Sequence, residues 1–190
     1  IWRNDGAAVE QALAKVTLNE RGRGGASLLM VALRQLRKTP QELGPLRALV
    51  KAGADPNLAG DGELPLAVAI QVSAKSGPEP VELLLRAGAN PNAQTQFGVP
   101  VYFQGTGKMV PLEVLDLLLK SGADLKARHQ NGREDVLMYA ALPGNWKAVK
   151  LLLERGATPG AEFRERLKPI PGASAEDNAA LEELKRLLPG

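Results

Sequence analysis

Apolar side chains recur at helical spacing in four segments of the chain, and a glycine follows each segment. In the second segment Val81, Leu84 and Leu85 fall on one face of a helix, because residues three and four positions apart are neighbours on a helix surface. The glycines that end the segments are 35, 34 and 34 residues apart, at Gly53, Gly88, Gly122 and Gly156. A fixed period of this size predicts a solenoid of similar stacked units.

Each segment carries the signals of a helix C-terminus. Glycine adopts the left-handed backbone conformation without the steric cost of a Cβ atom, so it suits the position just after a helix. The sequences Asp55-Pro56-Asn57 and Asn90-Pro91-Asn92 follow two of the glycines, and they favour a turn. A basic residue near each helix end is well placed against the helix dipole, at Lys51, Arg86, Lys120 and Arg155.

A second phrase lies about a dozen residues later and predicts the start of another helix. Its clearest copy is residues 62–69, Gly-Glu-Leu-Pro-Leu-Ala-Val-Ala. Pro65 suits the first turn of a helix, where its missing N–H is not needed. Weaker copies occupy residues 25–32, 98–103 and 132–141. Each unit is therefore predicted as a turn, a first helix, a joint and a leucine-rich second helix.

This order of elements resembles the ankyrin repeat over about residues 22–160. The Gly-Ala-Asp-Pro-Asn phrase carries the likeness most strongly. The family's other phrase, Gly-x-Thr-Pro-Leu-His-x-Ala-Ala, is matched loosely: no copy has the histidine, and Ser27, Leu64 or Val99 replaces the threonine. The resemblance implies an all-α ankyrin-repeat solenoid of stacked helix-turn-helix repeats, with β-turn fingers and helical caps.

The two ends of the chain are predicted to cap the stack. Residues 1–21 are interpreted as an N-terminal capping half-repeat with an amphipathic helix over 7–18, and residues 22–160 as about four repeats. Residues 161–190 are interpreted as a divergent C-terminal cap, with a short helix over 162–167 and a last helix that starts at Ser174. The buried stripe of that last helix is predicted at Leu181, Leu184 and Leu188.

Two joints between paired helices are longer than the others, residues 73–80 and 104–111. Both are rich in glycine and polar residues, so we expect them to be mobile, exposed loops. The second contains Gly105-Thr106-Gly107-Lys108. A phosphate-binding loop would need glycine where Tyr102 stands and serine or threonine where Met109 stands, so we interpret this segment as a loop only.

Composition narrows the function classes. The net charge of +3 is too small to indicate a nucleic-acid partner. The chain has no cysteine, which excludes disulfides and thiolate metal sites. No apolar run approaches the roughly 20 residues that cross a bilayer, so no membrane insertion is expected. The chain starts at Ile1, for which a removed signal peptide and a trimmed chain are equal explanations. A periplasmic location is the expectation, and a cytoplasmic one the alternative.

No constellation of catalytic residues is found in the sequence. His129 is the only histidine, and no nucleophile or second metal ligand is placed to converge on it. We therefore expect no catalytic residues, no cofactor and no metal, and no enzyme activity. A further alternative is that the chain is an enzyme whose catalytic residues lie within residues 161–190.

The resemblance implies a concave groove, lined by finger tips and first helices, where related proteins bind their partners. By position the finger tips are residues 58–63, 92–97 and 126–133. Large aromatic and arginine side chains commonly dominate interface energy. For Tyr102, as for Tyr139, a place in the core is the equal alternative, and Trp146 is predicted to pack either in the core or on the outer face. The candidate partner-binding residues are Leu58, Asp61, Glu63, Gln94, Gln96, Phe97, Tyr102, Phe103, Arg128, His129, Gln130 and Arg133.

The leading hypothesis for function is a non-catalytic module that binds a specific protein partner and is monomeric when free. Its finer version is a bacterial immunity protein that inhibits a toxic effector, for instance a secreted lipase. The alternative is an accessory protein that stabilises or protects a partner enzyme.

Overall fold

The structure is a computed structural model, and it describes residues 17–22, 25–129, 132, 134–160 and 163–188. The helix predicted over residues 7–18 lies outside these residues, apart from Thr17 and Leu18, which are not helical. The predicted boundaries of the two caps and of the repeat region stay predictions.

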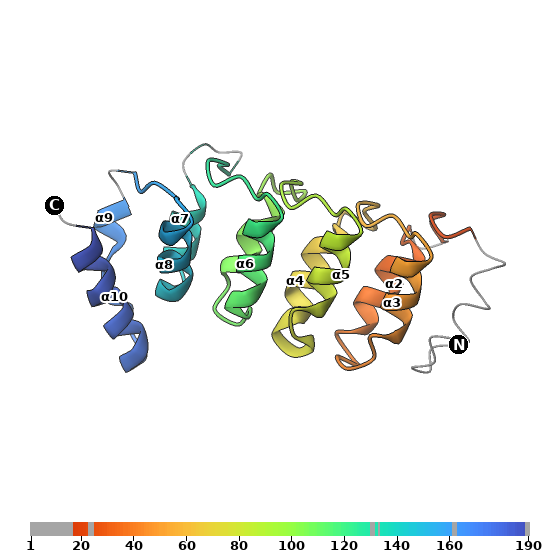
Figure 1. Ribbon diagram of the computed structural model, residues 1–190, viewed down its shortest axis with the longest axis horizontal. Coiled ribbons are helices and arrows are strands. Elements are labelled where there is room, and N and C mark those ends of the chain that lie inside the picture. Colours follow the sequence, from red (N-terminus) through yellow and green to blue (C-terminus); the bar gives the residue numbers. More distant parts are fainter. Residues whose placement is uncertain (1–16, 23–24, 130–131, 133, 161–162, 189–190) are drawn as a thin grey trace.

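Helix pairs stand side by side in a single row from one end of the described chain to the other (Figure 1). The turns that join one pair to the next run along one edge of the row, and the joints within pairs run along the opposite edge. The pairs are α2 (Leu28–Gln35) with α3 (Gly44–Lys51), α4 (Pro65–Ser76) with α5 (Glu79–Arg86), η1 (Val101–Thr106) with α6 (Leu112–Lys120), α7 (Val136–Ala141) with α8 (Trp146–Glu154), and α9 (Phe163–Arg166) with α10 (Ala175–Leu187).

The starts of the helices follow from local sequence. The side chain of Ser27 accepts a hydrogen bond from the Met30 N–H and caps α2, and Asp135 caps α7 in the same way. Pro65 is the first residue of α4, as predicted. The Ser174 side chain caps α10, as predicted, and Asp177 completes a reciprocal capping box.

The second helices end alike. The four glycines that define the period have φ between +88° and +93°, which confirms the left-handed conformation predicted for them. The residue after each glycine donates its N–H to a carbonyl in the last turn of the helix. Ala54, for example, donates to Leu49 at 3.0 Å, and Ala89 donates to Leu84 at 2.9 Å. The same backbone arrangement therefore ends the second helix in four successive units.

The core runs through the row without interruption, because each pair buries its apolar face against the next. The third unit fills its core with rings. The Tyr102 and Phe103 ring centroids are 4.9 Å apart in an edge-to-face arrangement, and Tyr139 of the next unit lies 5.4 Å from Phe103. Trp146 is buried, so of the two places predicted for it the core is the one that the structure shows.

The first helix of the third unit is a short 3-10 helix, η1. Gly105 explains its close packing, because a Cβ atom on Gly105 would lie 2.8 Å from the Leu118 side chain. The Thr106 hydroxyl is buried and donates to the Phe103 carbonyl at 2.8 Å. The prediction that the whole of residues 104–111 forms an exposed loop was therefore wrong for its first three residues, and only 107–111 form the joint.

The other long joint, predicted over residues 73–80, was also wrong in part. Helix α4 continues through Ser76 and stops at Gly77, where φ is +74°. Ser73 is buried, and its hydroxyl donates to the Ile70 carbonyl at 2.6 Å. A buried serine that satisfies itself within the helix costs little, so the helix extends by a turn.

Candidate functional site

The turns between successive helix pairs form short hairpins, which we call the finger edge (residues 57–64, 92–100 and the described part of 126–135). In the first, Gly60 and Glu63 exchange two backbone hydrogen bonds of 3.0 Å. The two residues between them, Asp61 and Gly62, both have positive φ, at +51° and +76°. This is the tight turn that matches the twist of a hairpin. The corresponding bridges in the other fingers join Gln94 to Pro100 and Arg128 to Asp135.

An asparagine ladder joins the bases of neighbouring fingers. The Asn57 side chain donates to the Gly88 carbonyl at 3.0 Å and accepts from the Asn90 N–H at 2.9 Å. One unit further along, the Asn92 side chain donates to the Gly122 carbonyl at 2.8 Å and accepts from the Asp124 N–H at 2.8 Å. Because a carboxamide carries a donor and an acceptor in one plane, each asparagine satisfies two backbone groups of the next finger.

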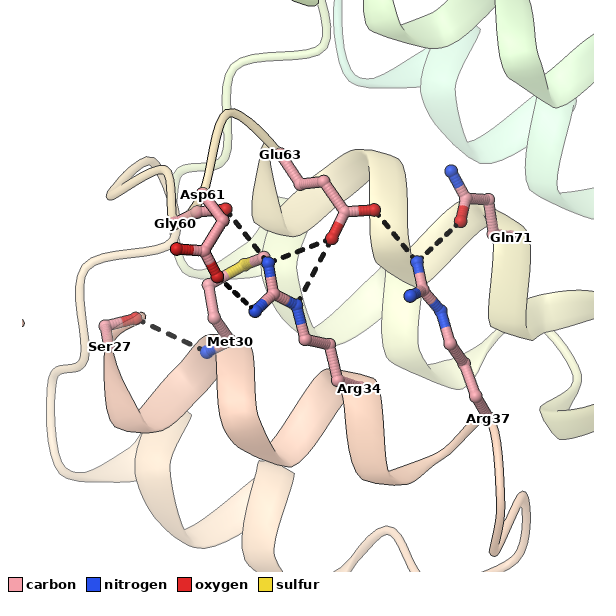
Figure 2. A network of polar contacts seen from close by, with 8 residues as sticks. All are labelled: Ser27, Met30, Arg34, Arg37, Gly60, Asp61, Glu63 and Gln71. Atoms are coloured by element: carbon pink, nitrogen blue, oxygen red, sulfur yellow. Dashed lines mark hydrogen bonds and ion pairs between the residues drawn. The ribbon is translucent and has the colours of Figure 1, made fainter. Parts of the chain in front are cut away.

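The guanidinium of Arg34, in α2, donates hydrogen bonds to three residues of the next finger (Figure 2). Its nitrogens donate to Asp61 Oδ2 at 2.6 Å, to Glu63 Oε2 at 3.0 and 3.2 Å, and to the Gly60 carbonyl at 3.0 Å. The hydrogen bond with Asp61 contributes most to raising the pKa of Arg34, against the opposing effect of burial. The finger is therefore held by its neighbour's first helix as well as by its own turn.

Arg37 extends this network to the next first helix. It donates to Glu63 Oε1 and to Gln71 Oε1, both at 2.9 Å (Figure 2). Partial burial on its own raises the pKa of Glu63, but the hydrogen bonds and charges of Arg37 and Arg34 outweigh it and hold the pKa below its usual value. Glu63 is consequently ionised near neutral pH and serves to fix the finger.

Phe97 is the most prominent of the predicted contact residues. It lies at the tip of the second finger, next to a turn in which the Gly98 N–H donates to the Thr95 carbonyl at 2.9 Å, and 72% of its surface is exposed. Gln94 and Gln96 of the same finger are exposed as well. The ring therefore lies outside the core of the described chain.

Two of the candidate contact residues are not on the surface: this corrects the prediction for Phe103, and for Tyr102 it supports the alternative place in the core. Tyr102 and Phe103 are fully buried in η1 and belong to the core. The Tyr102 hydroxyl donates to the Asp124 carbonyl at 2.7 Å, and burial raises its pKa. The rings are needed there because the third unit has a tight 3-10 helix whose core must be filled by large side chains.

The remaining predicted residues divide by their surroundings. The carboxylates of Asp61 and Glu63 are engaged by arginines of the same chain, so they present a neutralised surface. Leu58 and His129 are half-buried, and Arg128 is exposed. Gln130 and Arg133 lie outside the described residues.

Sequence reasoning missed several residues of this surface. Arg34, Arg37 and Gln71 were not among the candidates, although the cluster of basic residues after position 20 was a signal that could have pointed to two of them. The acidic partners of the two arginines are 26 to 29 residues away in sequence, and Gln71 is 34 residues from Arg37, so these pairings could not be predicted without the fold.

A second exposed apolar region lies along the opposite edge of the row, where the joints within pairs gather (the loop edge, residues 37–43, 77–78, 107–111, 142–145 and 167–174). Met109 is 81% exposed, and Leu112 and Leu142 are also exposed. A pocket of about 400 Å³ beside Leu142 is lined in part by Ile170 and Pro171. The exposure of Met109 agrees with the exposed loop predicted for this joint. None of these residues was predicted as a contact residue, because an isolated methionine in a glycine-rich joint gives no periodic signal.

The described residues contain neither a metal-binding cluster nor a membrane-spanning helix. Among them no three histidine, aspartate or glutamate side chains converge as a metal-binding group. None of the described helices combines the length and the apolarity that a membrane span requires.

Comparison with known families supports the reading of the fold. The family model for the ankyrin repeat matches residues 61–96, which contain the second half of the first finger, α4, α5 and the first part of the second finger. No curated protein matches the chain. Ankyrin repeats are modules of protein–protein interaction. The period, the shared glycine ends, the hairpin fingers and this match together make the chain an ankyrin-repeat protein.

Proposed function

We propose that this chain binds a specific protein partner along its finger edge, with Phe97 as the anchor. The observation that carries the proposal is the 72% exposure of this ring at a finger tip. An exposed aromatic side chain gains most when a partner covers it, and aromatic residues are enriched among the side chains that dominate interface energy.

The surroundings of Phe97 suit a protein contact. Gln94 and Gln96 provide polar side chains beside the ring, which is the mixture of apolar centre and polar rim found in protein interfaces. Gln96 also leans on the neighbouring finger, since a Cβ atom on Gly62 would lie 2.6 Å from Gln96 Oε1. The two fingers therefore present their tips together.

The finger edge is also organised before any partner arrives. The asparagine ladder fixes the bases of the fingers, and Arg34 and Arg37 fix the first tip. A surface that is already ordered loses less conformational entropy on binding, so more of the contact energy is available as affinity.

The test is capture of partner proteins from the source organism's lysate by three purified chains: wild type, Phe97→Ala and Met109→Ala. Met109 is the matched control because it is equally apolar and exposed but lies on the loop edge. We expect Phe97→Ala to weaken the specific partner's binding by at least tenfold, about 1.4 kcal/mol, and Met109→Ala to leave it unchanged. Loss of the partner with Met109→Ala alone would move the interface to the loop edge and overturn the proposal.

The finer form of the proposal is that the partner is a toxic effector enzyme, such as a secreted lipase, which this chain inhibits in the periplasm as an immunity protein. The support for it is the combination of a small repeat protein with a preformed binding edge. The captured enzyme's activity, titrated against the chain, is the test. Activity that falls to zero at one equivalent supports inhibition. Activity that persists longer on heating supports the alternative, an accessory protein that stabilises its partner.

A further inference from the structure

The asparagine ladder stops at the last described finger. Lys126 stands at the bridging position there, and its N–H donates to Asp124 Oδ1 at 2.9 Å, as the N–H of each bridging asparagine donates to the residue two positions before it. A lysine ammonium carries donors and no acceptor, so it does not replace the two-sided hydrogen bond of a carboxamide.

The groups that such a bridge would satisfy are therefore left over. By the period of the repeat, Gly156 and Thr158 correspond to Gly88 and Asn90, which Asn57 bridges. Within the described residues, the Gly156 carbonyl and the Thr158 N–H have no hydrogen-bond partner in the protein. An acceptor and a donor are thus both open at this joint, at the sequence positions that one amide bridges in the other joints.

A pocket occupies this joint. Its volume is about 660 Å³, and Lys126, Gly156 and Thr158 are among the residues that line it. Part of its lining is buried and apolar, at Val136, Leu137 and Ala157. The joint without an asparagine is therefore a concave site with apolar walls and one unsatisfied donor–acceptor pair, which are the features of a specific small binding site.

We propose that this pocket receives a side-chain carboxamide, an asparagine or glutamine of the partner protein, in the place of the missing bridge; the proposal rests on the protein-binding function above. The incoming amide nitrogen donates to the Gly156 carbonyl, and its oxygen accepts from the Thr158 N–H. A carboxylate has no donor for the carbonyl, and an apolar side chain has neither group. A hydroxyl carries its donor and acceptor on a single atom, so the carboxamide, which carries them on two atoms as Asn57 does, is the side-chain group that matches the pair. Asn57 and Asn92 already make this contact twice in the same chain.

The site adds specificity to the interface that Phe97 anchors. Gly156 and Thr158 are both exposed, so water competes for them and one amide binds weakly. We expect a dissociation constant on the order of 1–10 mM for an isolated amide. If a bound partner excludes water without supplying a carboxamide, the donor–acceptor pair loses its hydrogen bonds, and this costs binding free energy that it would not cost in water. The pair therefore discriminates against partners with another side chain at this position.

The experiment is an NMR titration of the whole ¹⁵N-labelled chain with N-acetyl-asparagine methylamide. N-acetyl-leucine methylamide is the control, because its side chain has nearly the same shape and no polar atom. We expect the Thr158 N–H resonance to shift saturably with the asparagine probe and not with the leucine probe. No shift with the asparagine probe, or equal shifts with both, would overturn the proposal.

Two variants sharpen the result. Lys126→Asn completes the ladder within the chain, so it should abolish the response at Thr158. Asn92→Lys opens the same gap one joint earlier, so the Asp124 N–H should gain a response. If either variant fails to fold, the wild-type titration with the two probes still decides.

The outcome is separable from the proposed function. Phe97→Ala should keep the full response to the asparagine probe, because Phe97 does not line the pocket. A probe response without any captured partner would leave the amide site standing while the protein-binding role falls. A Phe97-dependent partner without a probe response would do the reverse.

Discussion

The Lys108 ammonium lies 3.0 Å from the Asp177 carboxylate, although 69 residues separate the two in sequence. Lys108 belongs to the joint between η1 and α6, and Asp177 lies in the first turn of α10. The contact links the third helix pair directly to the last helix, along the loop edge. Hydrogen bonds from Lys108 and then from Ser174 lower the pKa of Asp177, which keeps the carboxylate charged as part of the capping box.

The capping box should contribute more than the distant ion pair. We expect Ser174→Ala to lower the free energy of unfolding by about 1 kcal/mol, the usual cost of losing a helix cap. Lys108→Ala should cost about 0.5 kcal/mol or less, because an exposed ion pair contributes little. Urea unfolding followed by circular dichroism measures both. A larger loss for Lys108→Ala than for Ser174→Ala would show that the cap is held mainly from outside the helix.

The two phenylalanines on either side of Pro100 should behave in opposite ways. Phe103→Ala empties a buried site and should cost about 3–5 kcal/mol of stability. Phe97→Ala removes an exposed ring and should cost within about 0.5 kcal/mol. Thermal and urea unfolding of the two variants give the comparison. Equal losses would contradict the assignment of Phe103 to the core and Phe97 to the surface.

The asparagine ladder should be visible in stability. Asn57→Ala and Asn92→Ala each remove two exposed hydrogen bonds and should lower the free energy of unfolding by about 1 kcal/mol. Lys126→Asn should raise it, because it supplies the bridge that the last joint lacks, while Lys126→Ala should leave it nearly unchanged. Urea midpoints at constant m-value are the measurement. A neutral Lys126→Asn variant would mean that the last joint does not accept the bridge.

The turn of the first finger should not tolerate a side chain at Gly62. Its φ of +76° strains any other residue, and a Cβ atom there meets the Gln96 amide. We expect Gly62→Ala to cost about 1–3 kcal/mol. Gly160→Ala is the matched control, because a Cβ atom at Gly160 meets nothing within 4 Å. It should be neutral or slightly stabilising, since alanine reduces the entropy of the unfolded chain.

Acid should weaken the protein through its paired carboxylates. Arginine partners lower the pKa of Glu63 and Glu79, so the folded state holds these groups ionised to lower pH than the unfolded chain does. The stability they contribute is complete above the usual pKa of 4.5 and is lost as pH falls through the lowered folded-state values.

Glu63→Gln tests this directly. At pH 7 it should lower the free energy of unfolding by less than about 1 kcal/mol. The difference from wild type should shrink as pH falls below 4.5 and through the lowered pKa of Glu63, because wild-type Glu63 itself then becomes protonated. It should also shrink at pH 7 in about 1 M salt, which screens exposed charges beyond roughly 3 Å. A difference that grows on acidification would show that the pKa is raised and not lowered.

Much of the fold could be predicted because it depends on residues that are close together in the sequence. The C-terminal glycines of the second helices, Pro65 at the start of α4 and Ser174 at the start of α10 all act within a few residues of their own position. Their conformations depend on Cβ sterics and on missing or added hydrogen-bonding groups. The 34- to 35-residue period then follows from the spacing of these signals alone.

The candidate site was less predictable. Phe97 could be placed at a finger tip from the sequence, but its role in binding stays a prediction. Tyr102 and Phe103 stand only five and six residues further, and the sequence left Tyr102 equally open between surface and core. Their burial depends on η1 winding as a 3-10 helix against Leu118, a contact that no local pattern announces.

The sequence by itself determined the repeating unit, its helix ends and its turns, since these depend on backbone preferences of residues close in the chain. Only the tertiary structure decided which polar groups are free. Arg34 and Glu63 neutralise each other across 29 residues, and Asn57 and Asn92 satisfy the fingers that follow them. The Thr158 N–H stays open because Lys126 has no acceptor to offer, and the Gly156 carbonyl has no hydrogen-bond partner among the described residues. Hydrogen bonding between stacked units is set by their contact in space, so the exposed, unsatisfied chemistry of this surface appears only once the stack is built.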